Sequence, residues 1–171
     1  MLRRIVATVR CARHGGTLIV LPAERADPAD HLAIKYPFLD EEPRRRIPSL
    51  AAGITTRLAE LHPRASTKPS DRVSWSHYEA SADPRLAELD EALFEVAHLV
   101  AMLANVDGAV VLTDELEILG FGAEISGAQP EVPSVDRSLD LEGKERISER
   151  TDRVGTRHRS AYRLCQSLHA R

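Results

Sequence analysis

The segment Asp107-Gly108-Ala109-Val110-Val111-Leu112 decides the predicted fold, because it joins a long amphipathic helix to a buried strand. Before it, apolar residues recur at steps of three and four over residues 86–103, which is the spacing of one helix face. Asp83 is a good N-cap and Pro84 fits the first helical turn, so the helix is predicted to run to about Asn105. The Asp-Gly pair then ends the helix, and the valine-rich run after it is typical of a strand inside a sheet.

The neighbouring segments extend this pattern in both directions. Thr113-Asp114-Glu115 resembles a turn and residues 116–121 a returning strand, which predicts a hairpin over residues 110–121. Near the start of the chain, a helical pattern over residues 5–12 ends at two glycines, and a strand is predicted at 17–21. This alternation predicts an α/β fold, with a mixed β-sheet flanked by helices.

Two segments lack a clear core pattern. Residues 23–82 are interrupted by six prolines and are predicted to be a Pro-rich insertion with a helical patch over 50–61. Arg44-Arg45-Arg46 lies in this insertion, and we interpret it as a solvated loop rather than a patch for phosphate or a partner. The polar stretch over residues 126–153 is predicted to be a mobile loop, with a short helix near 142–149 as its one regular element.

Length and composition exclude several classes of protein. A chain of 171 residues is predicted to form a single domain over 1–171, with an aliphatic core because aromatic residues make up only 4%. The net charge of −3 argues against a protein that coats nucleic acid or a membrane surface through bulk charge. Two cysteines cannot build a disulfide framework, and no apolar run approaches the roughly 20 residues of a membrane span. We therefore expect a cytoplasmic protein that binds neither membrane nor nucleic acid directly.

The stretch Gly155-Thr156-Arg157-His158-Arg159 is the first candidate for a binding site. It begins the last predicted helix, where Thr156 can cap and Gly155 lets a ligand approach the backbone. Free N–H groups and the positive end of the helix dipole favour an anion there. Cations in a first helical turn are disfavoured by about 0.3–1 kcal/mol each, and a polyphosphate reverses that penalty. The alternative is that these side chains simply extend into water.

Asp107 is the second candidate. A carboxylate before a buried strand is a common metal ligand or general base, and Gly108 and Ala109 leave room for a ligand beside the backbone. The alternative is an ordinary Asp-Gly turn. Taken together, an acid for a divalent metal and cations for phosphates are what nucleotidyl transfer requires, because its catalysis is mostly positioning and charge stabilisation.

These residues resemble a known family. Asp107-Gly108-Ala109, together with the segment from Gly155 through Ser160 to Ala161, is similar to the two signature motifs of diadenylate cyclase domains, such as the N-terminal domain of the DNA-integrity scanning protein. Gly15-Gly16 and the strand after it resemble the first buried strand of that family. The resemblance covers about residues 1–22 and 86–171. The Gly-Thr-Arg-His-Arg motif is quite specific. The two motifs in this order indicate the family more strongly than either motif alone.

The resemblance implies a function and a role for each motif residue. Each protomer of a homodimer would bind one ATP. The two ATP molecules would be condensed to cyclic di-AMP with release of pyrophosphate. Asp107 would bind Mg²⁺ or Mn²⁺ and help to activate the ribose 3′-hydroxyl, which makes it both the metal ligand and the catalytic residue. The remaining motif residues would contact the nucleotide, mainly its triphosphate: Gly108, Ala109, Gly155, Thr156, Arg157, His158, Arg159 and Ser160.

Three differences from the sequence pattern of the family favour an alternative function. The chain stops at Arg171, so the usual final strand of a diadenylate-cyclase-like fold is expected to be missing. The segment between the motifs is longer than usual. The sequence around Asp107 and Gly120-Phe121-Gly122 is more similar to that of sensor-type relatives than to that of the cyclases. The alternative function is therefore a non-catalytic module that binds ATP or a cyclic dinucleotide and signals to a partner.

Overall fold

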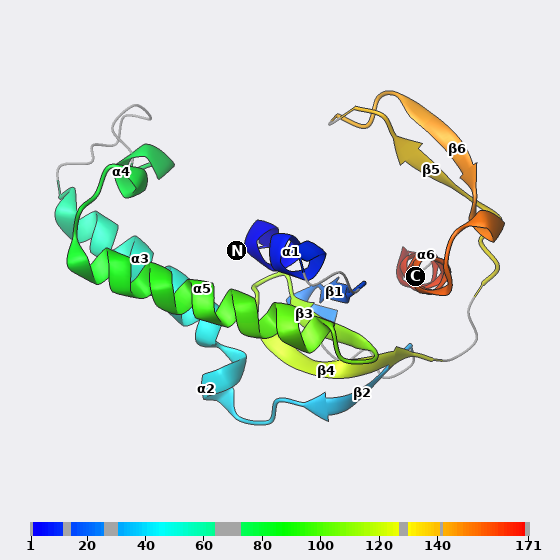
Figure 1. Cartoon of the computed structure of the whole chain (residues 1–171), viewed down its shortest axis with the longest axis horizontal. Coiled ribbons are helices and arrows are strands. Elements are labelled where there is room, and N and C mark those ends of the chain that lie inside the picture. Colours follow the sequence, from blue (N-terminus) through cyan, green and yellow to red (C-terminus); the bar gives the residue numbers. More distant parts are fainter. Residues whose placement is uncertain are drawn as a thin grey trace. The chain divides into compact units, whose positions relative to one another are not determined.

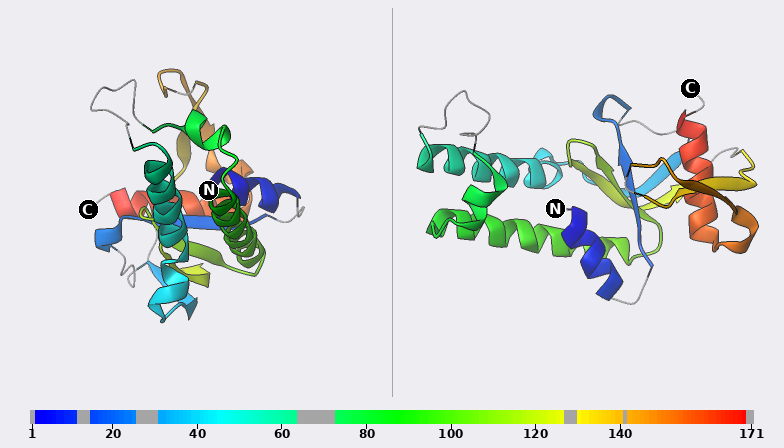
Figure 2. Two further views of the ribbon diagram at one scale, coloured as in Figure 1. Left: turned by 90° about the vertical axis from the view of Figure 1, so that its left-hand side faces the viewer. Right: turned by 90° about the horizontal axis from the view of Figure 1, so that it is seen from above.

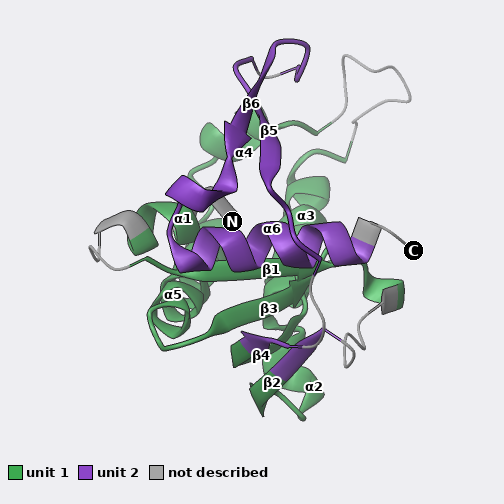
Figure 3. Ribbon diagram, turned by 90° about the vertical axis from the view of Figure 1, so that its right-hand side faces the viewer, with its two compact units in different colours: residues 1–26, 34–123 green, residues 27–33, 124–171 purple. Residues whose placement is uncertain are grey.

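A computed structural model of the chain describes residues 2–11, 15–25, 31–63, 73–126, 130–140 and 142–169 (Figure 1; further views in Figure 2). The chain divides into two compact units, each of which is described by itself (Figure 3). Unit 1 comprises Met1–Ala26 and Ile34–Ala123, and unit 2 comprises Asp27–Ala33 and Glu124–Arg171. Helices and strands are mixed along the chain, which confirms the predicted α/β class.

The main sheet has four strands in the order β1-β3-β4-β2. Its strands are β1 (Thr17–Leu21), β2 (Leu32–Pro37), β3 (Ala109–Thr113) and β4 (Ile118–Ile125). β3 is parallel to β1 and antiparallel to β4, so the sheet is mixed, and the predicted hairpin and first strand are both confirmed. All five residues of β3 are buried, and the strand lies between β1 and β4 in the sheet.

Three helices surround the core of unit 1. α5 (Pro84–Ala104) begins as predicted, with the Asp83 carboxylate accepting the N–H of Leu86 at 3.1 Å. α1 (Leu2–Cys11) and α3 (Arg46–Leu61) both pack along α5 (Figure 2). The buried cluster that these elements share with the sheet is aliphatic, as the composition predicts: Ile5, Ile47, Ala97, Val100, Ala101, Ala104, Val110, Leu112 and Ile118.

The predicted insertion contains more regular structure than its prolines suggested. It provides β2 at the edge of the main sheet, the short helices α2 (Glu41–Arg44) and α4 (Trp75–Glu79), and α3, which starts four residues before the predicted patch. Pro43 and Pro48 lie in first helical turns, where the missing N–H has no intrahelical partner in any case. Pro37 ends an edge strand, which is also tolerated. These three prolines therefore mark the ends of elements.

The arginine triplet is not the solvated loop that we predicted. It spans the junction of α2 and α3, and its side chains are ion-paired. Arg44 and Arg45 each lie 3.2 Å from a carboxylate oxygen of Glu117, which precedes β4. Arg46 lies 3.5 Å from Glu42, one helical turn earlier. Through the ion pairs with Glu117, the triplet connects the two helices to the β3–β4 turn.

Unit 2 contains a β-hairpin in place of the loop and short helix that we predicted over residues 126–153. β5 (Ser134–Ser138) pairs with antiparallel β6 (Arg146–Arg150), and a 3₁₀ turn at Thr151–Arg153 leads to α6 (Thr156–His169). The Asp140 carboxylate closes the hairpin turn by accepting the N–H groups of Lys144 and Glu145 at 2.9 and 3.1 Å. The predicted last helix is confirmed as α6.

Candidate functional site

Asp107 lies in the bend that connects α5 to β3. Its side chain is exposed, and it has no hydrogen bond or ion pair within the described part of the chain. The last carbonyls of α5 place the negative end of the helix dipole next to this bend. An exposed carboxylate beside a helix C-terminus is a suitable place for a cation, which would be attracted by both.

Gly108 is explained by packing rather than by room for a ligand. Its φ is +102°, and a Cβ at this position would lie 2.6 Å from the carbonyl carbon of Gly122 in β4. Ala109 is only 2% exposed and is paired with Ala123 in the antiparallel ladder. The space that we predicted beside these two residues is therefore occupied by protein.

The start of α6 has open surroundings, unlike the closely packed Gly108. Gly155 is exposed, and nothing lies within 4 Å of the position that a Cβ would take. Its carbonyl accepts the N–H of Arg159 at 3.2 Å, so Gly155 rather than Thr156 occupies the position before the helix. A glycine with open surroundings at a helix N-terminus lets a ligand reach the backbone N–H groups closely.

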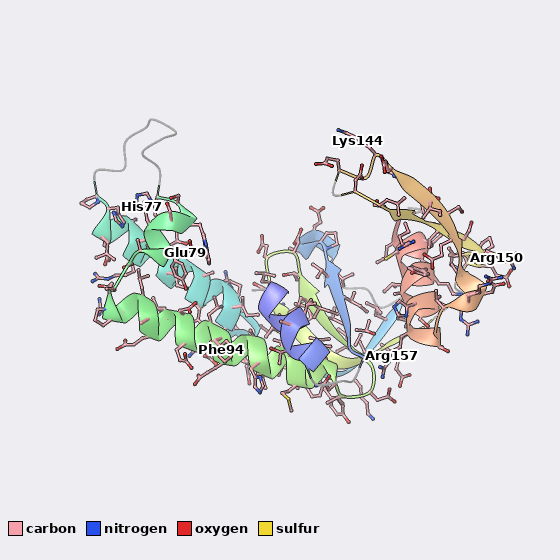
Figure 4. All side chains as sticks on the ribbon, turned by 45° about the horizontal axis from the view of Figure 1, so that its top comes forward. His77, Glu79, Phe94, Lys144, Arg150 and Arg157 are labelled. Atoms are coloured by element: carbon pink, nitrogen blue, oxygen red, sulfur yellow. The ribbon has the colours of Figure 1, made fainter. Side chains whose placement is uncertain are left out.

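The first turn of α6 carries three cationic or titratable side chains and no acidic residue. Arg157 and His158 are exposed, as is Thr156, whereas Arg159 and Ser160 are half-buried (Figure 4 labels Arg157). The helix dipole disfavours positive charge at this end of a helix, and an anion would relieve that effect. The predicted cationic helix start is therefore present in unit 2.

The carboxylates just before α6 do not add to a metal site. Glu149 lies 3.2 Å from Arg137 on the neighbouring strand. Asp152 forms a 2.6 Å ion pair with Arg150, and this hydrogen-bonded guanidinium lowers the pKa of the Asp152 carboxyl (Figure 4 labels Arg150). Each of these two acids is thus matched by an arginine of the hairpin.

An open depression of about 690 Å³ lies in unit 1 at the C-terminal end of α3, and sequence reasoning did not identify it. Its walls come from α3, α4 and the segment before α5: Leu61, His62, Ser76, His77, Ala80, Ser81 and Asp83. Four of the polar side chains already have hydrogen-bond partners, namely Ser76, His77, Ser81 and Asp83, and the ring of His62 contacts that of His77. His77 Nδ1 accepts the N–H of Ser74 at 3.1 Å, which completes a capping box for α4 (Figure 4 labels His77 and Glu79). Contacts within unit 1 therefore explain why these polar side chains line the depression.

Asp83, on the wall of this depression, also has a structural role. Its two carboxylate oxygens accept hydrogen bonds from Arg57 at 3.1 and 2.6 Å, in a bidentate arrangement. These bonds lower the pKa of Asp83, and the N–H of Leu86 lowers it further. The carboxylate joins α3 to the start of α5 and is not available as a general base.

The site residues fall into two groups that belong to different units. Asp107, Gly108 and Ala109 lie in unit 1, and residues 155–160 lie in unit 2. Within the described residues, no cluster of three or more His, Cys, Asp or Glu side chains could hold a metal ion. A divalent ion at Asp107 would therefore take most of its ligands from water and phosphate oxygens, which is common for Mg²⁺.

Two further findings complete the description of the chain. None of the helices in the described ranges has both the length and the apolar character that crossing a bilayer requires. In comparisons with protein-family models, with curated proteins and with solved structures, the chain matches none of them.

Proposed function

We propose that the chain is an adenine-nucleotide-binding domain of the diadenylate cyclase type, which condenses two ATP molecules to cyclic di-AMP. The observation that carries this proposal is the start of α6, where an open glycine and a cationic first turn coincide at a helix N-terminus. The ordered Asp-Gly-Ala and Gly-Thr-Arg-His-Arg motifs point to this family among nucleotide-binding proteins. The two motifs supply complementary chemistry, which is an acid for the metal and cations for the phosphates.

The proposed reaction balances as two identical transfers. In each, the 3′-hydroxyl oxygen of one ATP loses its proton and forms a bond to the α-phosphorus of the other. The bond from that phosphorus to the oxygen bridging to the β-phosphate breaks, and its electron pair leaves with pyrophosphate. Two transfers close the ring, giving one cyclic di-AMP and two pyrophosphates. Arg157 and Arg159 would hold the triphosphate, where their charge stabilises the departing pyrophosphate. Asp107 would hold Mg²⁺ or Mn²⁺ beside the attacking hydroxyl, which lowers the cost of losing its proton.

The test of turnover is incubation of the purified chain with ATP and Mg²⁺ or Mn²⁺, followed by chromatography of the nucleotides. We expect cyclic di-AMP and pyrophosphate in a 1:2 ratio, and loss of both when the metal is chelated. Asp107→Asn should abolish the product, whereas Glu115→Gln, at an exposed acid in the β3–β4 turn, should not. ATP that binds but yields no product at any protein concentration would exclude the cyclase.

The test of binding is calorimetric titration with ATP. Loss of a charge-assisted hydrogen bond costs about 1.5–3 kcal/mol, so Arg159→Ala should weaken ATP binding roughly 10- to 100-fold. Arg163→Ala, at an exposed arginine one turn further along α6, is the matched control and should leave the affinity unchanged. A folded chain that binds no nucleotide would contradict the proposal altogether.

The second candidate function is a sensor that binds ATP or a cyclic dinucleotide without chemistry. It is favoured by one observation: among the described residues, Asp107 belongs to no group of three or more side chains that could hold a metal ion. A sensor predicts that Asp107→Asn leaves nucleotide affinity intact while Arg159→Ala still reduces it. Because both functions predict weaker binding by Arg159→Ala, formation of cyclic di-AMP by the wild-type chain, and its loss in Asp107→Asn, is the result that separates them.

A further inference from the structure

The start of the short helix α4 depends on a histidine. α4 has only five residues and none of them is buried, so neither helix length nor core packing holds it in place. In a capping box the third helical position usually carries Glu or Gln, whose side chain accepts the N–H of the N-cap residue. Here His77 takes that position, and its Nδ1 accepts the N–H of Ser74 at 3.1 Å (Figure 4 labels His77). The N-terminal turn of α4 is therefore held by a titratable side chain.

The bond to Ser74 requires the neutral form of His77. A ring nitrogen accepts a hydrogen bond only through its lone pair, so the proton of the neutral ring must lie on Nε2. The hydroxyl oxygen of Ser74 also lies 2.8 Å from Nδ1. When a second proton binds at Nδ1, the hydroxyl can become an acceptor, but the backbone N–H can only donate and loses this partner. Protonation of His77 therefore breaks the capping box.

A second imidazole disfavours the charged form of this contact further. His62 follows the last turn of α3, and its ring lies 4.7 Å from the ring of His77 in an edge-to-face arrangement. Neutral aromatic rings pack well in this geometry, whereas two positive charges at this distance repel each other. Histidine is the side chain that ordinarily changes charge between about pH 5 and 8, so a fall in pH acts on both sides of the contact.

The carboxylates on the elements around α4 have other partners or face away. Arg57 of α3 is bonded both to Asp83, on the wall of the same depression, and to Glu60. On α5, Asp90 accepts a hydrogen bond from the tyrosine hydroxyl of α4. Glu79 lies two residues beyond the capping histidine, and side chains two positions apart on a helix do not face each other (Figure 4 labels both). The capping bond is thus the interaction that a change of pH alters at α4.

We propose that the capping box of α4 is a pH-sensitive switch. While His77 is neutral the box is closed and α4 is formed, and when His77 gains a proton the N-terminal turn opens and releases Trp75. Trp75 is the first residue of the helix, is 66% exposed, and has its ring 4.8 Å from that of Tyr78. Opening the turn separates the two rings and changes the aromatic surface that α4 presents. No residue of either nucleotide motif takes part, so the switch does not depend on the proposed function.

Fluorescence of the full chain is the first test, because Trp75 is its only tryptophan. We expect the emission to change in a single step between about pH 8 and 5. His77→Gln keeps an acceptor in the box but does not titrate, so it should retain the high-pH emission throughout. His98→Gln, at an exposed histidine of α5, is the matched control and should show the wild-type step. A wild-type chain without a step, or a step that persists in His77→Gln, would overturn the proposal.

A further variant identifies which imidazole is responsible. His62→Gln removes the neighbouring ring but leaves the bond between His77 and Ser74, so the fluorescence step should remain. Loss of the step in this variant would place the switch at the ring contact instead of the capping box, and would overturn the proposal.

Cα chemical shifts of residues 75–79 provide the second test, because they measure the helix itself, whereas fluorescence also responds to a charged ring near an indole. Loss of a helix cap raises the opening equilibrium by about 2- to 30-fold. We expect the shifts to move toward random-coil values as the wild type is acidified over the same range, and to stay constant in His77→Gln. Arg57 lowers the pKa of Asp83, so this carboxylate stays charged throughout. Emission that changes while the Cα shifts stay constant would overturn the proposal.

Discussion

Two glycines of the proposed motifs have different physical roles. Gly108 has a left-handed φ of +102° and is in close contact with the backbone of Gly122, so the fold itself excludes a side chain there. Gly155 has open surroundings, so the fold does not exclude one. A motif glycine of the first kind says little about a ligand, whereas one of the second kind is the better indicator of a binding role.

Gly108→Ala should destabilise unit 1. A non-glycine residue in a left-handed conformation costs of order 1–3 kcal/mol, and here the new Cβ also meets the Gly122 backbone. We expect the free energy of unfolding to fall by about 2 kcal/mol or more in urea denaturation. Gly155→Ala is the control for this measurement and should cost less than about 1 kcal/mol. Equal losses in the two variants would contradict the packing explanation for Gly108.

Gly155→Ala should instead affect ligand binding. If a phosphate approaches the N–H groups at the start of α6, a methyl group at this position obstructs it. We expect ATP affinity to fall at least tenfold by calorimetry, while the thermal midpoint of the free protein changes little. Unchanged affinity would show that no ligand approaches the backbone at Gly155.

The helices and strands that were predicted correctly are those with apolar faces and clear caps in the sequence. α5 was predicted because it has an N-cap at Asp83, a proline at the first position and a continuous apolar face. β3 was predicted because four apolar residues, Ala109 to Leu112, follow the Asp-Gly pair. β6 was missed because all five of its residues are exposed, which leaves no alternation of apolar and polar residues to detect. β2 was missed because only Leu32 is buried and the strand ends in a proline.

The position of the candidate residues was predictable only in part. The Asp-Gly bend before β3 and the glycine before α6 both lie where local patterns placed them. The contact between Gly108 and Gly122 could not be predicted, because it depends on how β4 pairs with β3 and on the irregular register between them. Local sequence reports turns and caps, whereas close backbone contacts arise from tertiary packing.

The Asp83 carboxylate should make the stability of the α3–α5 pair depend on pH. Arg57 lowers the pKa of Asp83, so its contribution is fully present above the unfolded value of about 3.9 and is lost as the pH falls through the folded value. Asp83→Asn should therefore lower the free energy of unfolding at pH 7, and the difference from wild type should shrink below about pH 4. Urea denaturation at pH 7, 4 and 3 measures this.

Asp40 is the matched control for Asp83. It also precedes a helix, α2, but its side chain makes no capping hydrogen bond. Asp40→Asn should leave the free energy of unfolding within about 0.5 kcal/mol of the wild type at each pH. A difference between wild type and Asp83→Asn that grows toward low pH would contradict the assigned direction of the pKa shift.

The β5–β6 hairpin should open independently of the rest of the chain. Its strands are largely exposed, so its amides exchange by local opening rather than by global unfolding. Asp140→Ala removes the acceptor for the N–H groups of Lys144 and Glu145, and we expect faster hydrogen exchange there with no change in the melting midpoint. Asp136→Ala, on β5, removes no such bond and should leave the exchange of these amides unchanged. A lower melting midpoint for Asp140→Ala would show instead that the hairpin unfolds with the core.

At the scale of the whole molecule, the near-neutral net charge hides a strong local separation of charge. The chain carries −3 overall, yet α5 has Glu88, Asp90, Glu91 and Glu95 between its start and its middle turn, and the first turn of α6 has no acid at all. The net charge therefore does not describe the local potentials. The acidic helix suits contact with another protein surface, and the cationic helix start suits a compact anion.

The nucleotide proposal makes a prediction about both units together. If Asp107 and the start of α6 serve the same ligand, ATP with Mg²⁺ should slow hydrogen exchange in both segments, residues 105–109 and 155–160. The exchange rate of these amides should fall by close to 100-fold when ATP is present at about 100 times its dissociation constant, because exchange then requires release of the ligand. AMP, which lacks the β- and γ-phosphates, should protect the start of α6 less. Protection at α6 alone, with no change near Asp107, would leave a phosphate-binding helix but would contradict a metal-dependent cyclase, because the acid that such a reaction needs would not meet the nucleotide.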